Sequence, residues 1–159
     1  MANRYLPSLF EKIFDCPFDK KNQTHRFQLQ HSIYLLATCG FPVWDYGYRW
    51  YRNGPIATDL ISDIFDLEEE NQRPLKLYAE LEQIIQEYKD IINSTKKGNY
   101  SLDMWIRCIA SLKYLKNNKM DFDSTPEEVV AELERRMPYL NNHEVNLVAY
   151  QVVCEQFRL

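Results

Sequence analysis

The segment from residue 41 to residue 55 holds the densest set of side chains that could recognise another molecule. Six aromatic residues and two arginines occur in this short stretch. Rigid rings and guanidinium groups dominate many protein-binding surfaces, because they bury a large area and donate directional hydrogen bonds. The pattern therefore indicates recognition rather than bond-making chemistry. The key residues are Phe41, Trp44, Tyr46, Tyr48, Arg49, Trp50, Tyr51, Arg52, Asn53, Gly54 and Pro55.

Residue types that serve catalysis or metal binding are present, but their spacing suits neither task. None of the three histidines, His25, His31 and His143, has a metal-type partner three or four residues away. The chain also lacks a Gly-x-Ser-x-Gly elbow, a His-Glu-x-x-His motif and a glycine-rich phosphate loop. We therefore predict no catalytic residue, no metal ligand and no cofactor, and we expect that the protein is not an enzyme. His31 is expected to be a half-buried, hydrogen-bonded histidine.

The cysteines and the hydropathy of the chain indicate the cellular setting. The four cysteines are dispersed with no Cys-x-x-Cys pair, so we expect neither a disulfide framework nor a zinc site. Cys39, Cys108 and Cys154 lie in apolar helical stretches and are expected to behave as small hydrophobic residues. The longest apolar run, Ile33–Cys39, is too short to cross a bilayer, and the N-terminus lacks the layout of a secretory signal. These features predict a cytoplasmic protein with no membrane contact, in a bacterial or phage setting.

Charge is unevenly distributed along the chain. The formal net charge is -4, yet residues 1–54 carry seven Lys or Arg against four Asp or Glu, a balance of +3. Residues 55–100 carry five against ten, and residues 101–159 carry seven against nine. An acidic chain lacks the electrostatic footprint of a general nucleic-acid binder, although the first third could form a small basic face.

Outside the aromatic segment the apolar residues recur at helical spacing. Gly40 and Gly54-Pro55 are strong stop signals, and Thr125-Pro126-Glu127-Glu128 is a capping box that starts a helix. The last helix is expected to be capped by Asn141. We predict a mainly α fold, a single-domain bundle of about six to seven helices over residues 1–159. The expected helices cover residues 6–14, 24–39, 58–67, 73–93, 101–116, 126–137 and 142–157.

Residues 43–52 break the helical rhythm and predict a short β strand or hairpin. In an extended chain Tyr48 and Trp50 point to one side, while Arg49 and Tyr51 point to the other. One aromatic side can be buried on the helices, but a domain of this size cannot easily bury both. The second side is therefore a candidate contact surface. The predicted partner-binding residues are Tyr48, Arg49, Trp50, Tyr51, Arg52, Gly54 and Pro55.

The order of these features resembles the Panacea domain, the SocA-like antitoxin family with its YwgA-like relatives, over residues 24–155. The resemblance rests on two regions. The first is Leu29-Gln30, Ile33-Tyr34-Leu35, the stretch Arg49–Pro55 and Leu60. The second is the helical stretch Trp105–Leu115 followed by Thr125–Glu128. His31 stands where the family usually has lysine, and the stretch Ile56–Asp59 after the Gly-Pro turn departs from the family pattern.

The resemblance implies a compact helical domain that binds another protein, a toxin in the best understood members, and it supplies no catalytic residues. From the residues and the resemblance together, we expect a non-enzymatic interaction domain whose partner is a toxin or a host or phage factor. A homodimer is left open. The alternative is a DNA-binding regulator in which the β element acts as the wing of a winged helix. The +3 balance of the first third motivates that alternative.

Overall fold

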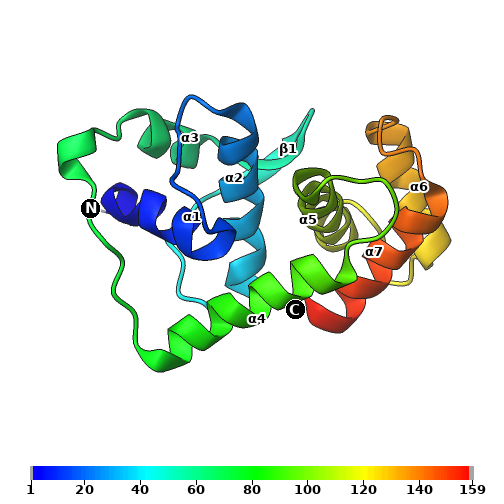
Figure 1. Cartoon of the computed structure of the whole chain (residues 1–159). Helices are drawn as coiled ribbons and strands as arrows, with labels where there is room; N and C mark the ends of the chain where they lie inside the picture. The colour runs from blue at the N-terminus through cyan, green and yellow to red at the C-terminus, as the bar shows by residue number, and fades with distance from the viewer. Residues whose placement is uncertain (1, 158–159) are drawn as a thin grey trace.

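The computed structural model describes residues 2–157, and the side chains from residue 4 onward. Within this part of the chain there are seven α-helices and one two-stranded antiparallel sheet, so the predicted mainly α fold with a short β hairpin is confirmed (Figure 1). No helix in the described part is long and apolar enough to span a membrane. The helices are α1 (Leu6–Phe14), α2 (Gln23–Thr38), α3 (Thr58–Phe65), α4 (Ala79–Thr95), α5 (Leu102–Asn118), α6 (Pro126–Arg136) and α7 (His143–Gln156), the strands are β1 (Tyr48–Tyr51) and β2 (Gly54–Ala57), and 3-10 turns span Ala2–Tyr5 and Glu69–Asn71.

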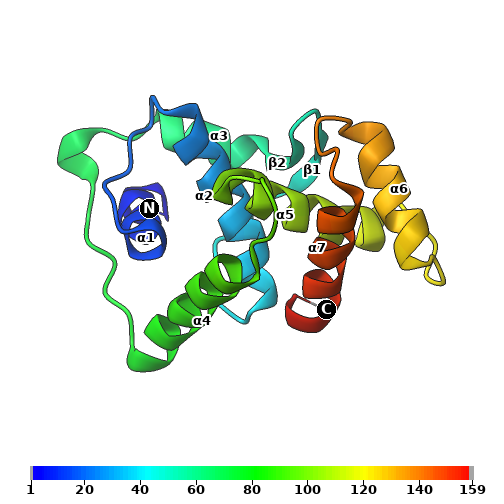
Figure 2. The same ribbon diagram turned by 45° about the vertical axis from the view of Figure 1, so that its right-hand side comes forward.

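Helix α5 lies at the centre of the helical arrangement. It packs against α2 and β2 on one side and against α6 and α7 on the other (Figures 1 and 2). Ten of its residues are buried, among them Trp105, Ile106 and Ile109, which have no exposed surface. Helix α1 packs against α4. One hydrophobic cluster runs through all seven helices, and the β hairpin rests on it.

The helix starts follow the capping chemistry of the sequence. Asn22 caps α2, where its side-chain oxygen accepts from the His25 backbone N–H at 3.2 Å. Thr125 and Glu128 form the predicted capping box, with Pro126 in the first helical position. The predicted cap of α7 is wrong by one residue. Asn142, not Asn141, accepts from the Val145 N–H at 3.2 Å.

The predicted helix over residues 73–93 begins six residues late, at Ala79. Proline disfavours helical geometry in the residue before it, and Pro74 keeps the chain extended here. Residues 72–78 run as an extended segment in which Leu75 and Leu77 are half-buried while their neighbours are exposed. The Leu75 N–H donates to Ser8 Oγ at 2.8 Å, so the segment bonds to α1 instead of extending α4.

The β element is shorter than residues 43–52 and gains a partner strand. Strand β1 begins at Tyr48 and pairs with β2, whereas residues 41–47 have no regular structure. In that stretch the Val43 N–H donates to the Phe41 carbonyl at 2.8 Å, and the Tyr46 N–H to the Trp44 carbonyl at 2.9 Å. Such bonds between residues two apart close tight turns and exclude an extended strand. The alternating aromatic pattern was therefore misleading over its first half.

Strand β2 is buried along its whole length, and a side chain of α2 satisfies its free edge. Gln30, itself 2% exposed, donates from Nε2 to the Ala57 carbonyl at 3.0 Å. Its Oε1 accepts from the Ala57 N–H at 3.1 Å. The amide thus makes the two bonds that a further strand would make. Buried backbone groups without a partner are costly, so this pair fixes the hairpin to α2.

We predict that Gln30→Met lowers the free energy of unfolding by about 1–3 kcal/mol, because it leaves the buried Ala57 N–H without a hydrogen-bond partner. Urea denaturation monitored by circular dichroism measures this change. Gln28→Met is the matched control, since Gln28 is a half-buried glutamine on the same helix. A change of equal size in both variants would contradict the assigned role of Gln30.

Candidate functional site

The hairpin is a short ribbon with two different sides. Strand β1 pairs antiparallel with β2, with Tyr48 opposite Ala57 and Tyr51 opposite Gly54, and Arg52 and Asn53 form the turn. Along β1 the side chains are alternately half-buried and exposed. This alternation follows from the two-residue period of a strand.

The inner side of the hairpin is fixed to three helices. The Tyr48 hydroxyl donates to the Gln30 carbonyl at 2.7 Å, and its ring centroid lies 5.0 Å from that of Tyr34 on α2. The Trp50 ring lies 6.0 Å from Tyr114 of α5, and the Arg136 guanidinium of α6 sits 5.3 Å from its centre. Burial raises the pKa of the Tyr48 hydroxyl well above its usual value, so it remains a hydrogen-bond donor.

The outer side of the hairpin is exposed. Arg49 and Arg52 are exposed, and Tyr51 exposes 43% of its surface. Among the residues that the structure describes, none forms an ion pair with either arginine. Two cations and an aromatic ring therefore face solvent on a ribbon that its other side holds in place.

The structure thus distributes the predicted partner-binding residues over three environments. Some of these residues are exposed and could contact a partner, whereas the half-buried and the buried residues support the exposed ones. The exposed residues are Arg49, Tyr51 and Arg52; the half-buried residues are Tyr48 and Trp50; the buried residues are Gly54 and Pro55.

The hairpin backbone approaches α5 closely at Gly54. This glycine has a positive φ of +92°, and a Cβ atom placed on it would lie 2.5 Å from Ser111 Oγ and 3.7 Å from His31 Nε2. A side chain is therefore excluded by both the backbone conformation and the contact. Glycine allows the turn to rest directly on the side chains of α2 and α5.

The expectation for His31 is wrong. The side chain has no exposed surface, and neither ring nitrogen has a hydrogen-bond partner among the described residues. It stacks on Phe27, with ring centroids 6.1 Å apart. Burial and the positive charge of Arg107 lower the pKa of His31 to about 3. The nearby Asn53 backbone partly opposes this lowering of the pKa, although neither ring nitrogen of His31 makes a hydrogen bond. His31 is therefore a neutral component of the core under the hairpin turn.

The other candidate residues lie apart from the hairpin's outer side. The two ring nitrogens of His143 lie 3.0 Å from Glu134 Oε2 and 3.1 Å from Glu127 Oε2. Within residues 2–157 no group of three or more His, Cys, Asp or Glu side chains could hold a metal ion. All four cysteines are free thiols; Cys108 is buried as expected, but Cys154 is exposed and does not act as a core residue.

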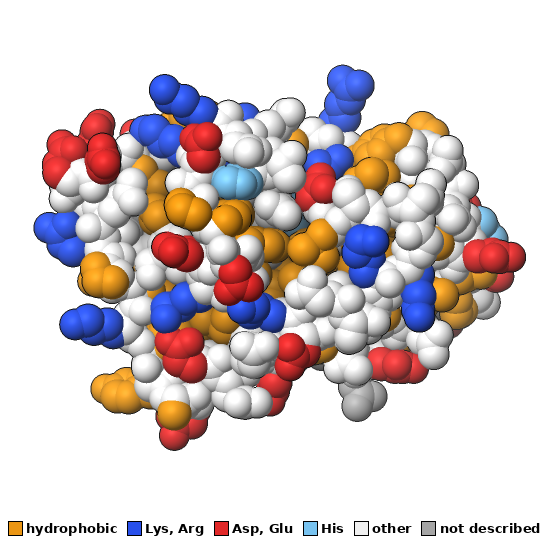
Figure 3. Space-filling view, in the orientation of Figure 1, with side chains coloured by type: hydrophobic (Ala, Val, Ile, Leu, Met, Phe, Trp, Pro, Cys, Tyr) orange, Lys and Arg blue, Asp and Glu red, His pale blue; other side chains and the backbone are white. Residues whose placement is uncertain are grey.

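The charged side chains do not form a basic band on the face seen in Figure 3. Acidic and basic groups are interspersed there, with hydrophobic side chains between them. An acidic cluster lies at the upper left, where Figure 1 places the segment between α3 and α4. Nucleic-acid binding surfaces concentrate lysine and arginine on one face or stripe, and this face has no such concentration.

Two supporting residues, Gln30 and Ser111, were not identified from the sequence. Ser111 stands among mostly apolar neighbours, where a polar residue is a signal of a buried hydrogen bond or a close approach, whereas Gln30, between Gln28 and His31, gives no such signal. What they contact could not be inferred, because the hairpin reaches them from a distant part of the chain. Comparison with protein-family models, curated proteins and solved structures finds no match to the chain.

We predict that Gly54→Ala lowers the free energy of unfolding by about 2–3 kcal/mol, because alanine is strained at positive φ and its methyl group clashes with Ser111. Urea denaturation measures the effect. Gly47→Ala is the matched control, since nothing lies within 4 Å of a Cβ placed there. Adding Ser111→Gly to Gly54→Ala should recover part of the loss. Equal stability of the two single variants would contradict the close approach.

We predict that acid destabilises the protein through His31. Its pKa falls from 6.5 to about 3 on folding, so below neutral pH the unfolded chain binds a proton that the native state excludes. Stability should therefore decrease as the pH drops. His31→Gln should reduce the loss between about pH 7 and about pH 5 by roughly 2 kcal/mol. Urea denaturation at both pH values tests this.

The control for the acid effect is Gln28→Met, which alters a non-titrating residue of α2 and leaves all three histidines in place. It should show the full acid-induced loss of the wild type. The same pH dependence in the wild type and in His31→Gln would show that His31 is not the group responsible.

Proposed function

We propose that this chain is a non-enzymatic, antitoxin-like domain that binds another protein through the outer side of its β hairpin. The observation that supports this proposal is the exposure of Arg49, Tyr51 and Arg52 on a ribbon whose inner side is held by α2, α5 and α6. The resemblance to SocA-like antitoxins supports the same class of function. The proposed setting is cytoplasmic and bacterial or phage, and the proposed partner is a toxin or a host or phage protein.

The fixed inner side favours binding energetically. Association loses free energy for every flexible group that must be ordered. Here the β ladder and the anchors of Tyr48 and Trp50 already order the backbone under the contact residues. Tyr51 has few rotatable bonds, so it buries a large ring with little loss of side-chain entropy.

The charge of the outer side indicates the chemistry of the partner surface. Arg49 and Arg52 place two guanidinium groups around Tyr51 without a carboxylate of the described chain to neutralise them. Guanidinium groups bind carboxylates in bidentate geometry, which adds direction to the attraction. We expect the partner to present acidic residues around an apolar depression that accepts the tyrosine ring.

We predict that Arg49→Ala combined with Tyr51→Ala weakens partner binding by at least about 100-fold, since two hot-spot side chains are lost. The partner is first captured from cells of the source organism and identified. Its affinity for the wild type and for each variant is then measured by biolayer interferometry. The helical circular dichroism spectrum should not change, because neither side chain supports the core.

The matched control is Lys76→Ala combined with Tyr78→Ala, which removes an exposed cation and an exposed tyrosine from the segment before α4. This variant should bind like the wild type. Equal binding by both double variants would place the contact elsewhere. Retention on DNA that falls steeply with salt, without a protein partner, would instead favour a DNA-binding regulator.

A further inference from the structure

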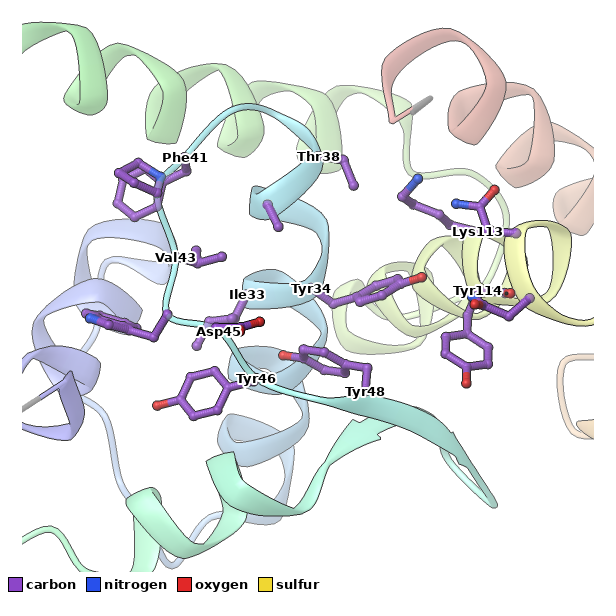
Figure 4. Close-up of a pocket in the computed structure, with 15 residues that line it drawn as sticks. Ile33, Tyr34, Thr38, Phe41, Val43, Asp45, Tyr46, Tyr48, Lys113 and Tyr114 are labelled. Carbon is purple, nitrogen blue, oxygen red and sulfur yellow. Dashed lines mark hydrogen bonds between the residues drawn. The ribbon is translucent and has the colours of Figure 1, made fainter.

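A concave site lies beside Tyr48, away from the outer side of the hairpin. A pocket of about 530 Å³ opens between the C-terminal half of α2, residues 41–48 and the C-terminal end of α5 (Figure 4). Its volume falls within the range of small-molecule sites, which is roughly 300–1,000 Å³. Its walls are largely aromatic, formed by Tyr34, Phe41, Trp44, Tyr46, Tyr48 and Tyr114.

Lys113 gives this pocket an unusual electrostatic character. The residue is only 3% exposed, yet no carboxylate in the described part of the chain forms an ion pair with its ammonium group. Most of the Lys113 side chain is covered, whereas its unpaired Nζ atom retains some solvent exposure at the pocket. Burial accordingly lowers the pKa of Lys113. The other charged lining residue, Asp45, is exposed and lies toward the opposite end in Figure 4.

The position of the pocket favours one negative charge over two. It is bordered by Ala37 and Thr38 at the end of α2 and by Asn117 and Asn118 at the end of α5. Helix C-termini carry partial negative charge, which supports the lysine cation and disfavours anions in proportion to their charge, so that it penalises a doubly charged phosphate more than a carboxylate. The lining has no arginine to offset this effect. A carboxylate is the anion that a single lysine in such a field suits.

The aromatic walls define the rest of the ligand. Figure 4 shows the Tyr34 hydroxyl directed toward α5, on the side of the pocket where Lys113 and Tyr114 lie. The rings of Tyr34 and Tyr48 are 5.0 Å apart, and those of Tyr34 and Tyr114 are 6.2 Å apart. At these distances the three rings pack on one another and form one aromatic wall, against which another ring or a branched apolar group can pack.

We propose that this pocket binds a small amphipathic carboxylic acid, with its carboxylate on the Lys113 ammonium and its apolar or aromatic body against the tyrosine rings. This activity is separate from the proposed binding of a protein by the outer side of the hairpin. The pocket uses the inner residue Tyr48, whereas the contact surface uses Arg49, Tyr51 and Arg52.

Isothermal titration calorimetry of the full chain with three matched probes tests the proposal. The probes are 4-phenylbutyrate, the neutral 4-phenylbutanamide and the cationic 4-phenylbutylamine. The acid should bind saturably, the amide about tenfold more weakly, and the amine not measurably, since only the acid forms the charge-assisted bond to Lys113. Shifts in a ¹H–¹⁵N NMR spectrum should be confined to residues around the pocket.

Variants of the chain locate the effect. Lys113→Met should bind the acid and the amide equally, whereas Lys119→Met, which alters an exposed lysine at the end of the same helix, should keep the preference. Ala37→Phe places a ring in the pocket from an exposed helical position and should abolish binding without disturbing the core. Arg49→Ala combined with Tyr51→Ala should bind the acid normally, which separates this result from the hairpin contact.

Equal affinity of the wild type for the acid and the amide would overturn the proposal, and that comparison does not depend on any variant folding. Absence of saturable binding of the acid at millimolar concentration would also overturn it. So would undiminished binding by Ala37→Phe, because the ligand would then lie outside the pocket.

Discussion

The rest of the structure depends on one constraint, which is that the buried backbone groups of strand β2 must have hydrogen-bond partners. A two-stranded ribbon has two free edges, and burying one of them without hydrogen-bond partners is costly. Gln30 removes this cost by bonding to both backbone groups of Ala57, and Gly54 allows the turn to lie on Ser111. Because β2 can then be buried between α2 and α5, one side of β1 is directed inward and its other side outward. The outward positions of Arg49 and Tyr51 follow from this arrangement.

The two proposed sites share this support and differ in the side they use. Tyr48 belongs to both the hairpin and the wall of the aromatic pocket, and its hydroxyl bond to Gln30 fixes the ring. Arg49 and Tyr51 alternate with Tyr48 and Trp50 along β1 and face solvent instead. The period of a strand therefore separates a surface suited to a protein from a cavity suited to a small molecule.

Local signals in the sequence predicted most of the fold, and long-range contacts account for what they missed. Capping residues and apolar spacing located the helices, because both act within one or two turns of the chain. The start of α4 was wrong because Pro74 and the bond from Leu75 to Ser8 outweighed a continuous apolar pattern. For the candidate site, the alternation of β1 separated Arg49 and Tyr51 from Tyr48 and Trp50. The roles of Gln30, Ser111 and Lys113 depend on residues distant in sequence, and no periodicity reports such contacts.

His31 and Lys113 show how differently the protein treats two buried ionisable groups. His31 is enclosed by Phe27, the hairpin turn and the α5 residues Arg107 and Ser111, so an added proton would be desolvated beside a neighbouring cation, and these two effects outweigh the favourable effect of the Asn53 backbone. Its neutral form is the one that fits, and the histidine serves as a flat, ring-shaped filler. Lys113 is nearly as well covered, but it borders an open pocket at two helix C-termini, where a positive charge is favoured. The fully enclosed, neutral His31 has a structural role. Lys113 borders an open pocket, and a ligand in that pocket can neutralise its charge. This difference is the physical reason to assign binding to Lys113 and packing to His31.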